Sequence, residues 1–129
     1  MPKKKIMLID DNEDFCFTMS VFFERNGFEV VSAEDGEVGW QKIQTEKPDL
    51  LLLDVMMESM FSGFEVCRRI RLDPALEHIP IIGVSAMNQE IGVQYDGHTD
   101  GEYFRVDDFL DKPIDKDVLI RKIDKLLKK

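Results

Sequence analysis

Two short runs of the chain, Ile6–Ile9 and Leu50–Leu53, contain only aliphatic side chains and methionine. A strand that is apolar at every position must be covered on both faces, which is typical of the central strands of a parallel sheet. Parallel neighbours are joined by crossover connections of about a dozen or more residues, usually helices. The two runs therefore predict an α/β fold with helices on both sides of a parallel sheet.

The rest of the chain alternates between strand patterns and helix patterns. Further strands are expected at Phe28–Ala33, Ile79–Val84 and Asp108–Leu110. Helices are expected after Asn12, over Gly36–Thr45 and Phe64–Leu72, and after Asp115, with Asn12 and Asp115 as N-caps. The second helix should be the weakest, because Gly39 lies in its interior. The alternation predicts one doubly wound domain over residues 1–129 with right-handed crossovers.

Composition excludes several classes of function. The 129 residues carry 17 Lys and Arg against 26 Asp and Glu, a net charge of -9, which argues against direct binding to a nucleic-acid backbone. Only four apolar residues follow the basic start, so we expect no export signal and no membrane span. Cys16 and Cys67 are expected to be reduced thiols of a cytoplasmic protein, with a disulfide or a ligand pair left open.

Polar side chains follow the expected strands at the point where each strand ends. These side chains belong to Asp10 and Asp11, Asp54, Ser85 and Lys112. Because the carboxyl ends of parallel strands meet at one edge of a sheet, where such folds bind their ligands, we expect these residues to share one pocket.

Three carboxylates held close together repel one another unless a cation lies between them. A hard divalent cation such as Mg²⁺ suits carboxylate oxygens and keeps open positions for phosphate oxygens. A hydroxyl group and an ammonium group can hold the remaining oxygens of a phosphoryl group. The pocket therefore predicts a magnesium site for phosphoryl chemistry.

Four fragments in this order, LIDDNEDF, LLLLDVMM, GVSA and DFLDKPID, closely resemble the receiver domain of two-component response regulators. The resemblance covers essentially the whole chain. It implies a flavodoxin-like (βα)5 fold with the strand order 2-1-3-4-5.

The resemblance also implies a role for each acidic residue of the pocket. Asp54 would be the phosphorylated aspartate, and Asp10 and Asp11 would bind Mg²⁺ together with Asp54. The backbone carbonyl of Met56 would complete the protein's share of the metal ligands.

The remaining residues of the pocket match the family's motif as well. Ser85 would donate a hydrogen bond to the phosphoryl group, and Lys112 would pair with it. Phe109 matches the aromatic switch position, although an aromatic residue in a short strand can also simply fill the core. The Lys112–Pro113 bond is expected to be cis, which proline permits.

The resemblance implies a sensor histidine kinase or a histidine phosphotransfer protein as phosphoryl donor, and an unidentified downstream protein partner. We expect a single receiver domain with no output domain, hence no direct contact with nucleic acid or membrane. We also expect a switch rather than a turnover enzyme. Met56 and Met87 should slow hydrolysis, because a thioether cannot orient or activate a water molecule.

The sequence departs from the family's pattern in two regions. Glu58 stands where the family has proline, and Gly63 arrives one residue late, so the loop after Asp54 should be altered. The segment from residue 88 to 108 is rich in glycine and lacks a sustained apolar stripe. Glycine disfavours helix, so the fourth helix is expected to be short or missing.

Two other functions compete with a phospho-accepting switch. One is a small Mg²⁺-dependent phosphatase in which Asp10 is the nucleophile and Asn12 completes a D-x-N motif. The other is a receiver-like binding module that is never phosphorylated. That reading would require a lost phosphoacceptor or lysine, and the chain retains both.

Overall fold

A five-stranded parallel sheet forms the centre of the molecule. The computed structural model describes residues 3–54, 62–85 and 106–127, and for Ser62, Phe64 and Ser85 it describes the backbone only. The strands are β1 (Lys5–Ile9), β2 (Glu29–Ala33), β3 (Leu50–Asp54), β4 (Ile81–Ser85) and β5 (Asp108–Asp111). Their order is β2-β1-β3-β4-β5 and every pair is parallel, as predicted.

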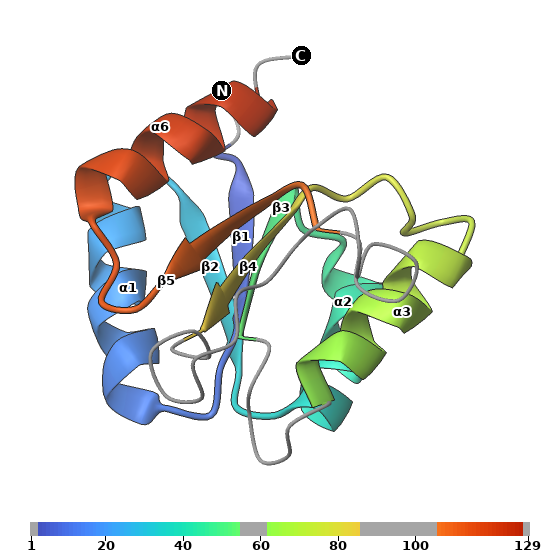
Figure 1. The fold of residues 1–129 in the computed structure, drawn as a ribbon. Coiled ribbons are helices and arrows are strands. Elements are labelled where there is room, and N and C mark those ends of the chain that lie inside the picture. The colour runs from blue at the N-terminus through green and yellow to red at the C-terminus, as the bar shows by residue number, and fades with distance from the viewer. Residues whose placement is uncertain (1–2, 55–61, 86–105, 128–129) are drawn as a thin grey trace.

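Within the described part of the chain, four helices cover the two faces of the sheet, and Figure 1 shows how they are arranged. They are α1 (Glu13–Arg25), α2 (Gly36–Glu46), α3 (Ser62–Leu72) and α6 (Lys116–Leu127). The helices α1 and α6 lie on one face, and α2 and α3 lie on the other (Figure 1). The prediction of a short or missing fourth helix falls between β4 and β5, outside the described residues.

Alternate side chains of the strands enter two separate cores. In β1, Ile6 and Leu8 pack with Met19 and Phe23 of α1 on one face. Met7 and Ile9 face the opposite way, into the core formed with α2 and α3. From Ile6 to Ile9 both faces of β1 are therefore fully buried, which explains why this run contains no polar residue, whereas Lys5 at the start of the strand is only partly buried.

Side chains at the helix starts satisfy backbone N–H groups that the helices leave without partners. The Asn12 side-chain oxygen accepts a hydrogen bond from Phe15 N at 3.0 Å, and Asp115 accepts one from Val118 N at 3.2 Å. These N-caps confirm the predicted starts of α1 and α6.

Two local features were not foreseen from the sequence. Gly39 lies where α2 approaches β1 closely: a Cβ atom added there would lie 2.5 Å from Cδ1 of Ile9, so glycine permits the approach. Strand β4 begins at Ile81 rather than Ile79. Pro80 precedes it, and proline has no N–H to donate to a strand ladder, although its carbonyl accepts from Leu51 N at 2.9 Å.

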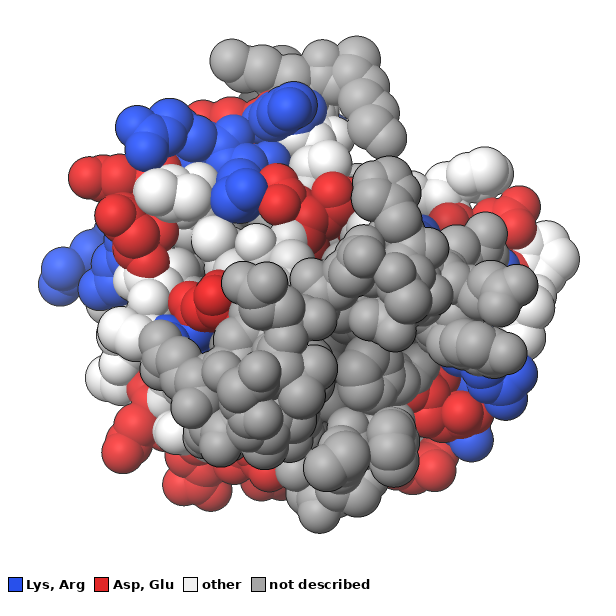
Figure 2. Space-filling model, in the orientation of Figure 1, with Lys and Arg blue, Asp and Glu red and all other residues white. Residues whose placement is uncertain are grey.

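Charge is distributed unevenly over the surface. Figure 2 shows Lys and Arg side chains gathered over α6, and Asp and Glu side chains along the lower edge, where β1 leads into α1 (compare Figure 1). The described helices are all too short or too polar to cross a bilayer.

Candidate functional site

Two buried carboxylates mark the carboxyl edge of the sheet. Asp10 and Asp54 are 2% and 5% exposed, and they are the buried charged residues of the described part of the chain. Ile9 of β1 pairs with Leu53 of β3, and each acid is the residue that directly follows one member of this pair. The neighbouring Asp11 is exposed, and each of the three acids offers a carboxylate oxygen within 4.8 Å of the others.

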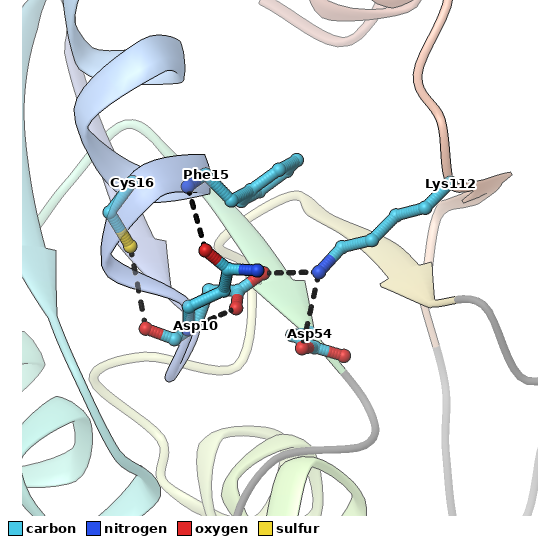
Figure 3. A network of polar contacts seen from close by, with 6 residues as sticks. Asp10, Phe15, Cys16, Asp54 and Lys112 are labelled. Carbon is cyan, nitrogen blue, oxygen red and sulfur yellow. Dashed lines mark hydrogen bonds and ion pairs between the residues drawn. The ribbon is translucent and has the colours of Figure 1, made fainter.

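Lys112 brings one positive charge to this cluster from the end of β5. Its Nζ atom lies 2.9 Å from Asp10 Oδ2 and 3.5 Å from Asp54 Oδ2 (Figure 3). Burial lowers the pKa of Lys112, but the hydrogen bond to Asp10 and the charge of Asp54 raise it more, so this pKa lies above its ordinary value. The ammonium group is therefore charged at neutral pH, and one lysine stands against three carboxyl groups in this cluster.

Local hydrogen bonds fix Asp10 in place. Its side-chain Oδ1 accepts from Asn12 N at 2.9 Å, and its backbone N donates to Ala33 O at 3.1 Å. The Cys16 thiol donates to the Asp10 carbonyl at 3.4 Å (Figure 3). The carboxylate is thus held by the turn into α1 rather than by a flexible loop.

The same surroundings suppress the reactivity of Cys16. Burial, followed by the negative charge of Asp10, raises the pKa of the Cys16 thiol to about 11. A thiol with such a pKa is protonated at neutral pH and is a poor nucleophile or metal ligand. Cys16 and Cys67 do not form a disulfide, as predicted.

The aromatic ring of Phe15 lies against Lys112, with the ring centroid 4.3 Å from Nζ (Figure 3). The sequence pattern assigned Phe15 only to the buried face of α1. Helical periodicity identifies that face, but the contact with a lysine 97 positions away depends on the folded arrangement of β5.

The three acids fit a hard divalent cation. Magnesium prefers oxygen ligands at about 2.0–2.1 Å and is commonly held by one or two carboxylates plus water and phosphate oxygens. Carboxylate oxygens of Asp10, Asp11 and Asp54 lie within 4.8 Å of one another, close enough for the three acids to share one ion. The excess of carboxyl groups over lysine provides the electrostatic reason for a cation to bind.

Comparison with known proteins assigns the family. Residues 6–124 match the model of the response regulator receiver domain. The chain belongs to this family. Its sheet order and its acidic edge agree with that assignment.

Relatives of this receiver domain differ in how much of their length it spans. The alkaline phosphatase synthesis transcriptional regulatory protein PhoP of Bacillus subtilis is 36% identical over 110 residues, which are 85% of this chain and 42% of PhoP. Protein PilH of Pseudomonas aeruginosa is 29% identical over 123 residues, which are 95% of this chain and 97% of PilH. The chain thus spans less than half of PhoP and nearly all of PilH.

Solved structures show the same fold. The receiver domain of a sensor histidine kinase from Pseudomonas aeruginosa superposes with a TM-score of 0.84 at 20% identity, covering 99% of this chain and 100% of that one. That structure has a magnesium ion coordinated in its active site cleft. At this level of identity the likeness concerns the fold alone.

The other predicted site residues of the receiver domain are placed only in part. Ser85 ends β4 opposite Asp111, at the same edge as the acids, while its side chain and the whole of Met56 lie outside the described residues. Phe109 is half-buried against the core on the α2 and α3 face, and its switch role remains a prediction. The Lys112–Pro113 bond is cis, as predicted.

Proposed function

We propose that this receiver domain accepts a phosphoryl group on Asp54 and thereby changes its partner-binding surface. The observation that supports the proposal is the placement of Asp54 beside Asp10, Asp11 and Lys112 at one edge of the sheet. A buried carboxylate next to a cation site and an ammonium group is suited to in-line phosphoryl transfer, which depends on position and charge neutralisation.

The donor is a phosphohistidine of a sensor histidine kinase or of a histidine phosphotransfer protein. A carboxylate oxygen of Asp54 attacks the phosphorus atom, and a bond between oxygen and phosphorus forms as the bond between phosphorus and nitrogen breaks. The electron pair of the broken bond returns to the imidazole nitrogen, which takes up a proton. The product is an acyl phosphate on Asp54.

Asp10, Asp11 and Asp54 would hold Mg²⁺, with the Met56 carbonyl as a further ligand. When bound, this ion supplies charge neutralisation for the phosphoryl oxygens. Lys112 would supply a second positive charge and pair with a phosphoryl oxygen. The proposal is supported by the contacts of Lys112 with Asp10 and Asp54, which keep the ammonium group beside the carboxylate that would accept the phosphoryl group.

The phosphoryl group would bias two arrangements of the surface near β4 and β5. Ser85 would donate a hydrogen bond to it, and Phe109 would move from its half-buried position to a more buried one. A switch of this kind shifts a population between two states rather than building a new structure. The downstream protein partner would bind one of the two surfaces.

Intact-mass measurement after incubation with acetyl phosphate and Mg²⁺ tests the proposal. The chain should gain the mass of one phosphoryl group, and Asp54→Ala should gain none. Asp124→Ala is the matched control, because Asp124 is an exposed aspartate of α6 and its loss should leave the gain intact.

Other outcomes separate the competing functions. Steady turnover of p-nitrophenyl phosphate that Asp10→Ala abolishes would indicate a phosphatase instead. A chain that binds Mg²⁺ but gains no mass with acetyl phosphate would indicate a binding module that is not phosphorylated. Equal mass gains in the wild type and in Asp54→Ala would assign the phosphoryl group to a different residue.

A further inference from the structure

We propose that Phe15 is a positioning residue for Lys112: the face of its ring keeps the ammonium group between Asp10 and Asp54. The inference rests on the proposed function, because the lysine in question serves the proposed phosphoryl-acceptor site. It assigns a task at that site to a residue that otherwise counts only as part of the α1 core.

The contacts of Lys112 leave a role for the ring. An ammonium group has three N–H donors, and the described carboxylate partners are Asp10 at 2.9 Å and Asp54 at 3.5 Å. The second distance is at the limit of a hydrogen bond, so it constrains the lysine weakly. The ring of Phe15, at 4.3 Å from Nζ to its centroid, attracts the ammonium group through its electron-rich face.

The ring is itself held in a fixed relation to Asp10. The backbone N of Phe15 donates to Asn12 Oδ1, and the backbone N of Asn12 donates to Asp10 Oδ1. One turn of chain therefore sets both the carboxylate and the ring that contact Lys112 (Figure 3). Phe15 also packs against the core on the α1 and α6 face, which restricts its rotation.

The surroundings of the lysine explain why such a contact is needed. A groove of about 400 Å³ opens beside Phe15 and Lys112, with Met19 and Ile114 among its lining residues. A lysine side chain is flexible and its ammonium group is strongly hydrated, so an open groove offers it alternative positions. The ring disfavours those positions by occupying one side of the ammonium group.

A second contact between a phenylalanine ring of α1 and a lysine supplies a matched control. Phe22 lies two turns after Phe15 and also packs against the α1 and α6 core. Its ring centroid is 5.6 Å from Nζ of Lys116, an exposed lysine outside the acidic cluster. Phe22→Leu removes an equivalent ring and an equivalent type of contact without touching Lys112.

The direct test is the proton NMR spectrum of the full chain without Mg²⁺ or phosphoryl donor. Protons above an aromatic ring are shifted upfield, so the ε protons of Lys112 should be upfield of those of a lysine with no aromatic neighbour. Phe15→Leu and Phe15→Met, which both replace the ring with a smaller non-aromatic side chain, should both abolish this shift. Phe15→Tyr and Phe22→Leu should both keep it. An unchanged Lys112 shift in folded Phe15→Met, or an equal loss in Phe22→Leu, would overturn the proposal.

A second measurement connects position to chemistry. Phosphorylation of Asp54 by acetyl phosphate should slow by roughly fivefold in Phe15→Met, the factor that corresponds to loss of one partly exposed cation–π contact. Phe15→Tyr should restore the rate and Phe22→Leu should leave it unchanged. An undiminished rate in Phe15→Met would overturn the role in the site. If wild-type Asp54 takes up no phosphoryl group while the NMR pattern holds, the proposed function fails and the positioning of Lys112 stands.

Discussion

The two ends of the sheet carry similar sets of charges in different surroundings. At the amino end, Nζ of Lys5 lies 3.0 Å from Glu46 Oε1 and 4.0 Å from Glu29 Oε2. The third acid there is Asp49, whose Oδ2 accepts a hydrogen bond from the backbone N of Lys5 at 2.7 Å. This amino-end cluster thus contains one lysine and three carboxylates.

The carboxyl-end cluster contains the same number of each, namely Lys112 with Asp10, Asp11 and Asp54. The difference lies in burial. The carboxylate side chains of Asp10 and Asp54 are 2% and 5% exposed. At the amino end the acids that contact the lysine side chain are well exposed, with Glu46 at 37% and Glu29 at 57%.

The burial of the acids, rather than the number of charges or the pKa of the lysine, distinguishes the carboxyl-end cluster from the amino-end cluster. Both lysines have a raised pKa, in Lys5 because of the hydrogen bond from its ammonium group to Glu46 and in Lys112 because Asp10 and Asp54 outweigh burial. Water screens the exposed acids, so their mutual repulsion is small. The buried acids are screened much less, and their excess negative charge favours a bound cation.

The largest expected difference between the two clusters concerns stability without metal. Lys112→Met should lower the free energy of unfolding by about 3 kcal/mol, because removing one partner of a buried ion pair leaves uncompensated charge behind. Lys5→Met should have a much smaller effect, since water solvates the remaining acids. Urea unfolding at pH 7 in the presence of EDTA measures both. Equal losses of unfolding free energy in the two variants would show that the burial of Asp10 and Asp54 does not determine how much the lysine stabilises the fold.

A second difference concerns magnesium. At a hundredfold excess over its dissociation constant, a ligand that binds only the folded state stabilises it by about 2.7 kcal/mol. The wild type should show a gain of this size, and Asp10→Asn should lose most of it because a ligand oxygen and a charge are removed. Glu46→Gln is the matched control at the amino end and should keep the full gain. If the stabilisation by Mg²⁺ survives in Asp10→Asn but falls in Glu46→Gln, the ion binds at the amino end of the sheet and the predicted site is wrong.

The sequence predicted the carboxyl-end cluster because parallel topology determines it. Runs that are apolar at every position identified β1 and β3 as central strands, and neighbouring parallel strands end at the same edge. Asp10 and Asp54 had to be close once Ile9 and Leu53 were paired. The strand order itself came from the resemblance to a family, since periodicity does not specify which strands are neighbours.

Contacts that depend on exact packing were not predictable in this way. Helical periodicity places Phe15 on the buried face of α1 but does not identify Lys112 as the neighbour of its ring. Helix propensity predicts only that Gly39 lowers the stability of α2. It does not show why glycine is there, which is that Ile9 lies too close to leave room for a side chain. The amino-end cluster was missed as well, because Glu46 and Asp49 reach Lys5 only after α2 has crossed back to the start of β3.

The smallest expected effect uses Cys16 as a probe of charge at the carboxyl end. With a pKa of about 11, raised first by burial and then by Asp10, roughly one thiol in a thousand is ionised at pH 8. In a Cys67→Ala background, iodoacetamide should therefore react slowly, and its rate should keep rising with pH beyond 9, where an ordinary thiol approaches its plateau.

Asp10→Asn should lower the pKa of Cys16, because one of the negative charges that oppose thiolate formation is removed while the backbone carbonyl that accepts from the thiol remains. The pH profile of alkylation should then shift toward lower pH. Glu46→Gln removes a charge of the same sign at the exposed amino end and should leave the profile unchanged. Solvent and salt should screen a charge at the far end of the sheet, so Glu46→Gln should not reach Cys16. An identical shift in both variants would therefore mean that the pKa of Cys16 responds to the net charge of the molecule and not to the buried cluster beside it.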